Sequence, residues 1–277
     1  MGSPADLNPQ AAQMAHESMV RTLAAQTEAI WPQEWPLMTR YGLAPGTRVL
    51  DVGCGTGEFE LRLARAVPGL DLTGVDVEES SLALARERAA RVPPPTRLRF
   101  AHGDAYALPF DDSAFDVVSC RHVLQAIPDA PRVVAQLTRV LRPGGWLHLL
   151  AEDYAMLHMQ PGALDPDEFW REGPVEFTER TGTDARVGRR AWSILAAQGF
   201  EELRVDYVVV DTLRVPRRVF ADIIAAWRDG YVDALAGGSR RPREWFRAQF
   251  DQMVGGILDP AQYAVWFVPI VGGRKPA

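Results

Sequence analysis

The feature that most constrains the fold is a regular alternation of short apolar runs with amphipathic segments between residues 48 and 151. Apolar runs bounded by glycine, proline or charged residues predict strands, and the longer segments between them predict helices. Strands that alternate with helices form a parallel sheet covered on both faces. We therefore predict an α/β, doubly wound fold, with strands at 48–52, 70–75, 98–101, 115–119 and 146–151 and helices at 59–67, 79–91 and 130–141.

The flanking regions predict further elements. Residues 9–30 are rich in Ala, Gln, Glu and Met and favour a helix, whereas the prolines of residues 31–46 favour short helical pieces. Beyond residue 155 we expect a helix at 184–198 and strands at 203–212 and 264–271, with two amphipathic helices between those strands. The sheet would then have seven strands and be mostly parallel.

Composition narrows the class of protein. Of the 277 residues, 47% are apolar and 24% are charged, as in folded globular proteins. The net charge of −6 makes a nucleic acid or an anionic membrane an unexpected partner. The two cysteines, Cys54 and Cys120, are too few for a disulfide framework or a cysteine-based zinc site, and we expect no metal. No apolar run is long enough for a membrane helix, so we expect a soluble, cytoplasmic protein.

A glycine-rich turn follows the first predicted strand. Gly53, Gly55 and Gly57 stand at alternate positions before a helix, where the backbone can approach a ligand and free N–H groups point toward it. Position 58 is Glu, so the G-x-G-x-x-G pattern of dinucleotide sites is not met, and no phosphate-binding G-x-x-x-x-G-K-[ST] motif occurs. An NAD-dependent oxidoreductase is therefore disfavoured.

Two acids follow the next strands. Asp76 ends the second strand, where a carboxylate can accept hydrogen bonds from both hydroxyls of a ribose. Asp104, within Gly103-Asp104-Ala105, follows the third strand and can accept a hydrogen bond from an adenine amine. A ribose and an adenine without a phosphate cradle predict an adenosyl ligand that is not a nucleotide.

These motifs together resemble the class I S-adenosylmethionine-dependent methyltransferases. The resemblance covers residues 49–153 and rests on Leu50-Asp51-Val52-Gly53-Cys54-Gly55-Thr56-Gly57, Gly74-Val75-Asp76, the segments 107–110 and 115–118, and Arg139-Val140-Leu141-Arg142-Pro143-Gly144-Gly145. It implies a Rossmann-like fold with helical lid insertions and S-adenosylmethionine as cofactor. The chain would be one domain, 1–277, made of an N-terminal helical lid segment (1–46), a cofactor-binding core (47–155) and a substrate-side half (156–277) with a helical insertion at 215–260.

The resemblance also implies roles for single residues. The loop of Gly53, Cys54, Gly55 and Gly57 would hold the methionyl part of the cofactor, Asp76 the ribose, Val77 one adenine face, and Asp104, with Gly103 and Ala105, the adenine amine. Asp51 would act from behind these contacts, and backbone near Cys120 and Arg121 would face the amino group. Structural roles stay open: Cys54 as an apolar filler, Asp104 as the cap of a turn, and Arg21 and Arg40 as solvated side chains rather than ligands of the cofactor carboxylate.

Methyl transfer from a sulfonium needs alignment and exclusion of water, and only some acceptors need a base. In a doubly wound sheet the site lies beyond the carboxyl ends of the strands. His122 follows the fourth strand in a sequence without the Pro-Pro-aromatic element of enzymes that methylate nucleic-acid bases, and Glu152, Tyr154 and His158 follow the fifth. These four residues are the candidates for acceptor orientation or proton removal. Capping, packing and structural roles are their alternatives, and His148 is predicted to be structural.

Aromatic residues at helical spacing mark the insertion between the last two predicted strands: Trp227, Tyr231, Trp245, Phe246 and Phe250. They are expected either to form ordinary core or, together with the segment 14–19, to cover the acceptor pocket as a lid. Arg240, Arg241, Arg243 and Arg247 could bind an acidic acceptor or form a solvated helix face.

The sequence as a whole predicts an S-adenosylmethionine-dependent methyltransferase that modifies O, N or C of a small aromatic or heteroaromatic metabolite, in secondary metabolism. A lipid, quinone or protein side chain as acceptor, and a catalytically silent S-adenosylmethionine-binding protein, are the alternatives. A homodimer is left open.

Overall fold

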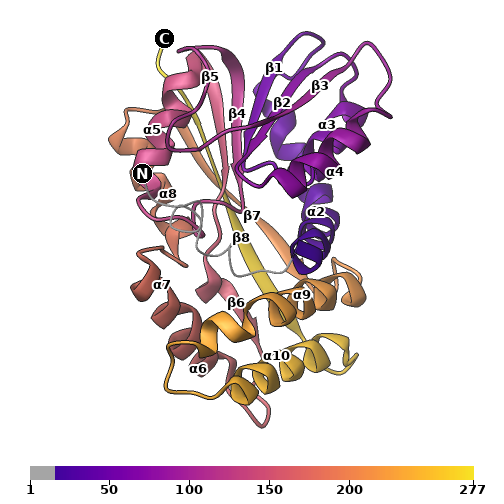
Figure 1. Ribbon diagram of the computed structural model, residues 1–277, viewed down its shortest axis with the longest axis vertical. Helices are drawn as coiled ribbons and strands as arrows, with labels where there is room; N and C mark the ends of the chain where they lie inside the picture. The colour runs from indigo at the N-terminus through magenta and orange to yellow at the C-terminus, as the bar shows by residue number, and fades with distance from the viewer. Residues whose placement is uncertain (1–15) are drawn as a thin grey trace.

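The computed structural model describes residues 16–277. These residues form one mixed sheet of eight strands, in the order β3-β2-β1-β4-β5-β8-β6, with β7 also paired to β8 (Figure 1). The strands are β1 (Arg48–Val52), β2 (Asp71–Asp76), β3 (Arg97–His102), β4 (Phe115–Arg121), β5 (Leu141–Leu150), β6 (Leu157–Met159), β7 (Glu201–Asp211) and β8 (Ala264–Arg274). The first five strands pair in parallel, whereas β8 runs antiparallel to β5, β6 and β7.

Helices cover both faces of the parallel part, as Figure 1 shows. They are α3 (Glu58–Ala66), α4 (Glu79–Ala89), α5 (Ala130–Val140) and α8 (Ala191–Ala197). Helix α5 illustrates why they form: Asp129 caps its N-terminus by accepting a hydrogen bond from Arg132 N, and Val133 and Leu137 bury one face against the sheet. The prediction of an α/β, mostly parallel fold is confirmed.

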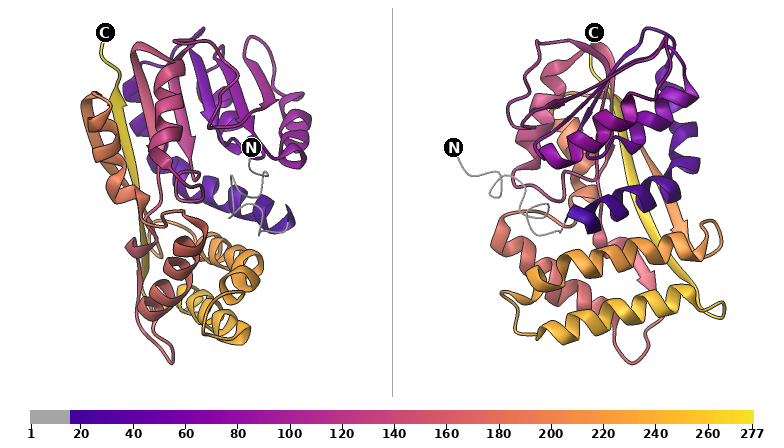
Figure 2. Two further views of the ribbon diagram at one scale, coloured as in Figure 1. Left: turned by 60° about the vertical axis from the view of Figure 1, so that its left-hand side comes forward. Right: turned by 45° about the vertical axis from the view of Figure 1, so that its right-hand side comes forward.

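A second apolar core lies below the sheet, where α6 (Pro166–Trp170), α7 (Glu176–Thr181), α9 (Arg217–Ala236) and α10 (Arg243–Leu258) gather around the lower part of β8 (Figures 1 and 2). The buried Phe220, Phe246, Phe250 and Trp266 fill it. The long strand β8 joins the two halves, since one end pairs with β5 and the other with β6. None of the helices within residues 16–277 is long and apolar enough to cross a bilayer.

Helix α2 (His16–Met38) corrects the expectation of short helical pieces in residues 31–46, because it continues through Pro32 and Pro36. A proline inside a helix removes a hydrogen bond and costs about 3 kcal/mol. Packing outweighs that cost here, since Ile30, Glu34 and Met38 recur at helical spacing and are fully buried. Met14, which the lid prediction included, lies outside the described residues.

Three smaller differences concern single elements. Strand β5 begins at Leu141 and passes through Pro143-Gly144-Gly145, where the sequence predicts a turn, with an irregular register against β4. The helix predicted at 184–198 is a 3₁₀ turn, Val187–Arg190, followed by α8. The short strand β6, which the sequence does not predict, brings the sheet from seven strands to eight.

Candidate active site

The glycine turn between β1 and α3 has a backbone that side chains would not tolerate. Gly53, Gly55 and Gly57 have φ angles of +78°, +52° and +75°. A Cβ atom on Gly53 would lie 2.2 Å from Val123 Cγ2, and one on Gly55 would lie 2.6 Å from Leu23 Cδ1. Left-handed backbone and close neighbours together explain why glycine occupies these positions. The loop is a cradle whose inner surface is backbone.

Asp76 ties the end of β2 to this loop. One carboxylate oxygen accepts a hydrogen bond from Gly55 N at 2.8 Å, and the other accepts one from Glu78 N at 2.9 Å. Burial raises the pKa of Asp76, and these backbone N–H groups oppose that rise. The carboxylate is thereby held at the rim of the loop, at the carboxyl end of its strand.

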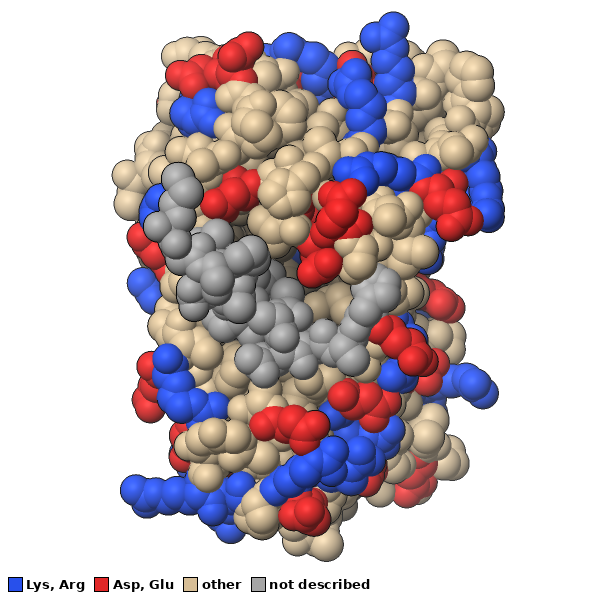
Figure 3. All heavy atoms as spheres, in the orientation of Figure 1, with Lys and Arg blue, Asp and Glu red and all other residues tan. Residues whose placement is uncertain are grey.

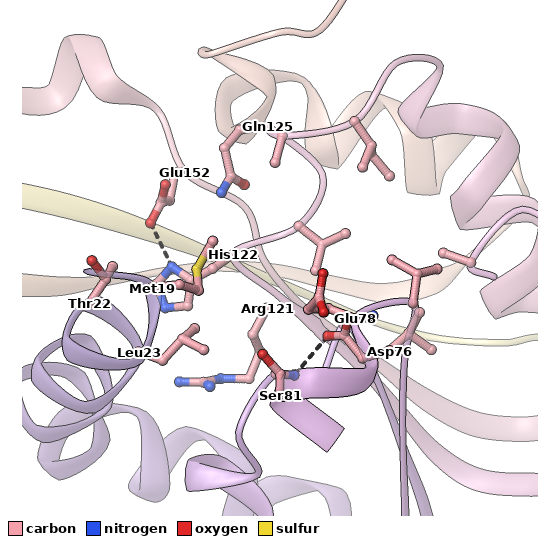
Figure 4. Close-up of a pocket in the computed structure, with 18 of the residues that line it drawn as sticks. Met19, Thr22, Leu23, Asp76, Glu78, Ser81, Arg121, His122, Gln125 and Glu152 are labelled. Carbon is pink, nitrogen blue, oxygen red and sulfur yellow. Dashed lines mark hydrogen bonds and ion pairs between the residues drawn. The ribbon is translucent and has the colours of Figure 1, made fainter. Parts of the chain in front are cut away.

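A cavity of about 300 Å³ runs from the glycine loop to the carboxyl ends of β4 and β5 (Figure 4). Figure 4 shows Asp76 and Glu78 at one end and Glu152 and His122 at the other, with α2 along one side. The cavity brings together most of the predicted site residues: Gly53, Gly55, Asp76, Val77, Gly103, Asp104, Ala105, Arg121, His122, Glu152 and Tyr154. Asp104 also accepts a hydrogen bond from Tyr106 N, as a turn cap does, so the two roles weighed for it coexist.

Four predicted cofactor residues do not line the cavity: Asp51, Cys54, Gly57 and Cys120. Asp51 lies behind the loop, hydrogen-bonded to Ser119, where burial raises its pKa to about 7 against the opposing charge of Arg121. Both cysteines are free and buried, and burial raises their pKa well above the usual thiol value. Such thiols are unreactive, which favours the filler role for Cys54. Gly57 caps the N-terminus of α3.

His158 is separated from the site. It lies in β6, paired with Val265 of β8, and is exposed to solvent. The prediction that it contacts the acceptor region is corrected by this placement, because the chain turns away from the cavity after Tyr154 and joins the lower half of β8.

The aromatic residues of the helical insertion at 215–260 lie partly at the cavity and partly in the core. Trp227 and Tyr231 of α9 line the cavity, whereas Phe246 and Phe250 of α10 are buried in the lower core. Of the predicted arginine cluster, Arg241 pairs with Glu168 and Glu172, and Arg243 pairs with Asp233. On the face drawn in Figure 3, basic and acidic side chains are interspersed. Likewise, Arg21 pairs with Asp229 and Arg40 with Asp206, which are surface ion pairs rather than cavity contacts.

His122 and Glu152 form a hydrogen-bonded pair at the inner end of the cavity. Their Nδ1 and Oε1 atoms are 2.6 Å apart, and Gln26 Nε2 donates to the same Oε1 at 3.0 Å. His122 has a φ angle of +58°, a conformation uncommon outside glycine that is often found at functional sites. Its Nε2 atom is buried and has no hydrogen-bond partner among the described residues. The pair therefore leaves one ring nitrogen without a hydrogen-bond partner among the described residues, buried in the wall of the cavity.

The segment 14–19 was expected to cover the pocket, and Met19 lines the cavity. Sequence reasoning missed the contribution of the rest of α2: Thr22, Leu23 and Gln26 also line the cavity, and Gln26 is 126 positions away from its partner Glu152. Nothing local in a helix rich in Ala and Gln marks those positions. The signal that could have found them is the polar residues Thr22 and Gln26, four positions apart on one helix face.

Sequence reasoning also missed a buried cluster of charged residues next to the site. Both guanidinium bonds from Arg121 to Glu34 measure 2.7 Å, and the guanidinium lies 4.3 Å from the ring centroid of Phe59. His148 Nε2 lies 3.0 Å from Glu34 Oε1, and its Nδ1 lies 2.9 Å from the hydroxyl of Tyr41. His148 is fully buried in β5, in agreement with the structural role expected for it. The cluster anchors α2 to β4 and β5.

Comparison with known proteins shows what the core of the chain is similar to. The profile described as "Methyltransferase domain" matches residues 50–149. Residues 50–149 are thus similar to a methyltransferase domain. Demethylmenaquinone methyltransferases of Staphylococcus aureus are 33% identical to the chain over 131 residues, which is 47% of this chain and 52% of theirs. The chain thus spans about half the length of these curated relatives.

Solved structures agree on the fold. Phosphoethanolamine N-methyltransferase 2 of Haemonchus contortus, in complex with S-adenosyl-L-methionine, has a TM-score of 0.56 and 23% identity, over 89% of this chain and 53% of that one. The [4+2]-cyclase SpnF also has a TM-score of 0.56, with 26% identity over 86% of this chain and 78% of that one.

The cofactor of the methyltransferase domain is S-adenosylmethionine, and the residues present fit it. Gly53 and Gly55 line the cavity without side chains of their own, and the carboxylate of Asp76 is hydrogen-bonded to the backbone of this loop. Val77 and Asp104 line the same cavity. A backbone cradle and two acids suit an amino-acid sulfonium joined to a nucleoside, in agreement with the prediction from the sequence.

Proposed function

We propose that the chain transfers the methyl group of S-adenosylmethionine to a small hydroxylated aromatic acceptor, with His122 as the base that takes the hydroxyl proton. The observation that carries the proposal is the His122–Glu152 pair, which lines the same cavity as the glycine cradle and leaves Nε2 without a partner among the described residues. The bound cofactor would supply an electrophilic methyl group.

Glu152 would set the protonation of His122. A carboxylate that accepts a hydrogen bond from Nδ1–H keeps the lone pair on Nε2, as in other catalytic pairs of histidine with an acid. Gln26 donates to the same carboxylate oxygen and holds it in place. In the proposed reaction the acceptor O–H bond would break and its proton would go to Nε2. The acceptor oxygen would then bond to the methyl group as the bond from that group to the sulfonium sulfur breaks, with its electron pair left on sulfur as a thioether. Methylation of a ring carbon activated by the oxygen would in addition release the proton of that carbon. The positive charge formed on the imidazole would be compensated by Glu152.

Aromatic side chains support an aromatic acceptor. Tyr154, Trp227 and Tyr231 line the cavity beside His122 and Glu152, and their rings can pack against a planar ring. The curated relatives are named demethylmenaquinone methyltransferases, which makes a quinone-type acceptor the nearest alternative. Because the neighbour SpnF is titled a [4+2]-cyclase, likeness of fold alone does not establish methyl transfer.

Methyl transfer tests the proposal directly. The purified protein is incubated with S-adenosylmethionine labelled in the methyl group and with a panel of phenols, catechols and hydroquinones, and labelled products are counted. We expect His122→Asn, which keeps a residue tolerant of positive φ, and Glu152→Gln to lower turnover by about a hundredfold or more while calorimetry with S-adenosylhomocysteine shows unchanged affinity. The matched control His158→Asn, outside the cavity, keeps full turnover. Cofactor binding without transfer to any compound would favour the silent alternative.

A further inference from the structure

A second, smaller cavity adjoins the active-site cavity. The two share Tyr154, Trp227 and Tyr231, and the smaller one, of about 40 Å³, continues from them into the lower core. We call it the side chamber. Beyond the shared residues its walls are mostly aromatic and aliphatic, and include Phe169, Trp170, Phe177, Leu235 and Phe250.

Tyr154 stands between the two cavities. Its ring stacks on Trp170, with centroids 5.6 Å apart and planes 11° apart, and meets the edge of Trp227 at 5.4 Å. Burial, followed by the charge of Glu152, raises the pKa of Tyr154 well above its usual value, so its hydroxyl stays protonated. The residue thus offers a polar end near Glu152 and an apolar ring to the side chamber.

The walls of the side chamber suit hydrocarbon better than water. The hydroxyl of Thr178 already donates to Val175 O at 2.8 Å, and Trp170 Nε1 is a single buried donor without a partner among the described residues. A cavity of 40 Å³ has room for about three water-sized groups, but an ordered water needs two to four polar partners. Little in these walls can supply that number.

We propose that the side chamber is a subsite for a short apolar substituent on the acceptor, an alkyl or alkenyl chain of about three or four carbons. The hydroxylated ring would lie between His122 and Tyr154, and the chain would pass Trp227 into the chamber. The placement of the acceptor ring beside His122 rests on the proposed function. The presence of an apolar subsite rests on the shape and walls of the cavity alone.

Binding of 4-n-alkylphenols, from phenol to 4-hexylphenol, tests the subsite without any need for turnover. Calorimetry on the full chain gives the Kd of each compound. We expect affinity to rise about fourfold for each methylene that enters the chamber and to level off after about four carbons. A Kd independent of chain length would overturn the proposal.

Two variants and a control localise the effect. Leu235→Trp, which fills the chamber, should abolish most of the gain with chain length, whereas Phe177→Leu, which enlarges it, should move the plateau to a longer chain. Leu213→Trp makes the same substitution as the first variant at a residue that is 79% exposed and outside the chamber, and should leave the series unchanged. Thermal unfolding checks that each variant is folded.

The outcomes separate the two proposals. A chain-length series that Leu235→Trp abolishes, in a protein that methylates none of the phenols, supports the subsite and contradicts the base role of His122. Methyl transfer to phenols, with an affinity that does not depend on chain length, supports the base role of His122 and contradicts the subsite. If Leu235→Trp and Leu213→Trp change the series equally, binding in the chamber is rejected.

Discussion

Gly53 shows at the scale of one residue how tightly the cofactor loop is built. Its φ is +78°, and Val123 leaves no room for a Cβ atom. Gly199 has the same φ of +78° but no atom within 4 Å of a Cβ. We expect Gly199→Ala to lower the free energy of unfolding by about 1 kcal/mol through backbone strain alone, and Gly53→Ala to lower it by a further 1–3 kcal/mol, roughly, through overpacking. Urea unfolding measures both, and equal losses would contradict the role of Val123.

Asp76 should control affinity for the cofactor. We expect Asp76→Ala to weaken binding of S-adenosylhomocysteine by about 1–3 kcal/mol, because ribose hydroxyls would lose a charged acceptor and Gly55 N its partner. Calorimetry measures the change. Asp71→Ala, at the other end of β2 and paired with Arg99, is the matched control and should bind normally. Unchanged affinity in Asp76→Ala would reject the assignment.

Residues in local motifs were predictable, and residues with distant partners were not. Gly53, Asp76 and Asp104 follow strands in patterns that are visible within a few positions, and all three line the cavity. Glu34 is joined to a partner 87 positions away, and a charged residue in a helix is by default expected to face solvent. Only the fold brings the two charges together.

At the scale of the element, α2 depends on that ion pair. Burial alone would raise the pKa of Glu34, but Arg121 and His148 outweigh it and lower the pKa to about 2. Since the native carboxyl then binds a proton less readily than the unfolded one, its contribution to stability is present above about pH 4.5 and is lost as the pH falls toward 2. Urea unfolding between pH 3 and 7 should show this loss.

The variant Glu34→Gln isolates the effect. It should flatten that part of the pH dependence and lower the free energy of unfolding at pH 7 by about 3–5 kcal/mol, because buried Arg121 would lose the carboxylate to which it is hydrogen-bonded. Glu28→Gln changes an exposed carboxyl of the same helix and should leave both quantities nearly unchanged. A pH dependence that survives Glu34→Gln would assign it to other groups.

Helix α2 also shows why element boundaries are hard to predict. Pro32 and Pro36 predict interruptions by local rules, whereas the buried positions Ile30, Glu34 and Met38 follow a helical spacing across both prolines. Tertiary packing decides in favour of the helix. The strands of the core are better predicted, since β1 begins and ends at the predicted residues, 48–52.

At the scale of the whole molecule, the cavity draws on both halves of the chain. Residues of the matched domain line one side, while Met19 and Leu23 of α2 and Trp227 of α9 line the other. The methyltransferase profile covers only residues 50–149. Beyond residue 155 the sequence predicts β7, β8, α9 and α10 but not β6, α6 or α7, and it does not predict where these elements lie in space. Where α9 and α10 lie depends on packing between the two helices and of α9 against α2, which no local pattern encodes.

Cofactor binding should therefore stabilise more than the matched domain. S-adenosylhomocysteine at about one hundred times its Kd should raise the free energy of unfolding by about 2.7 kcal/mol. Hydrogen exchange should slow in the glycine loop and also in α2, since Leu23 packs on Gly55. Helix α10 contributes no residue to this cavity and serves as the internal control. Protection confined to residues 50–149 would contradict a shared binding site.

Strand β8 limits how far the distance between the upper and lower halves of the molecule can change as the sequence evolves. Its upper end is in register with β5, and lower down Trp266 packs edge-on against Trp227 with centroids 5.3 Å apart. Because a continuous strand cannot stretch, Trp227 and its neighbours on α9 stay at a fixed distance from the glycine loop on the other side of the cavity. Substitutions among the α9 residues that line the cavity can thus change which acceptor binds, while the distance between these residues and the cofactor site stays constant.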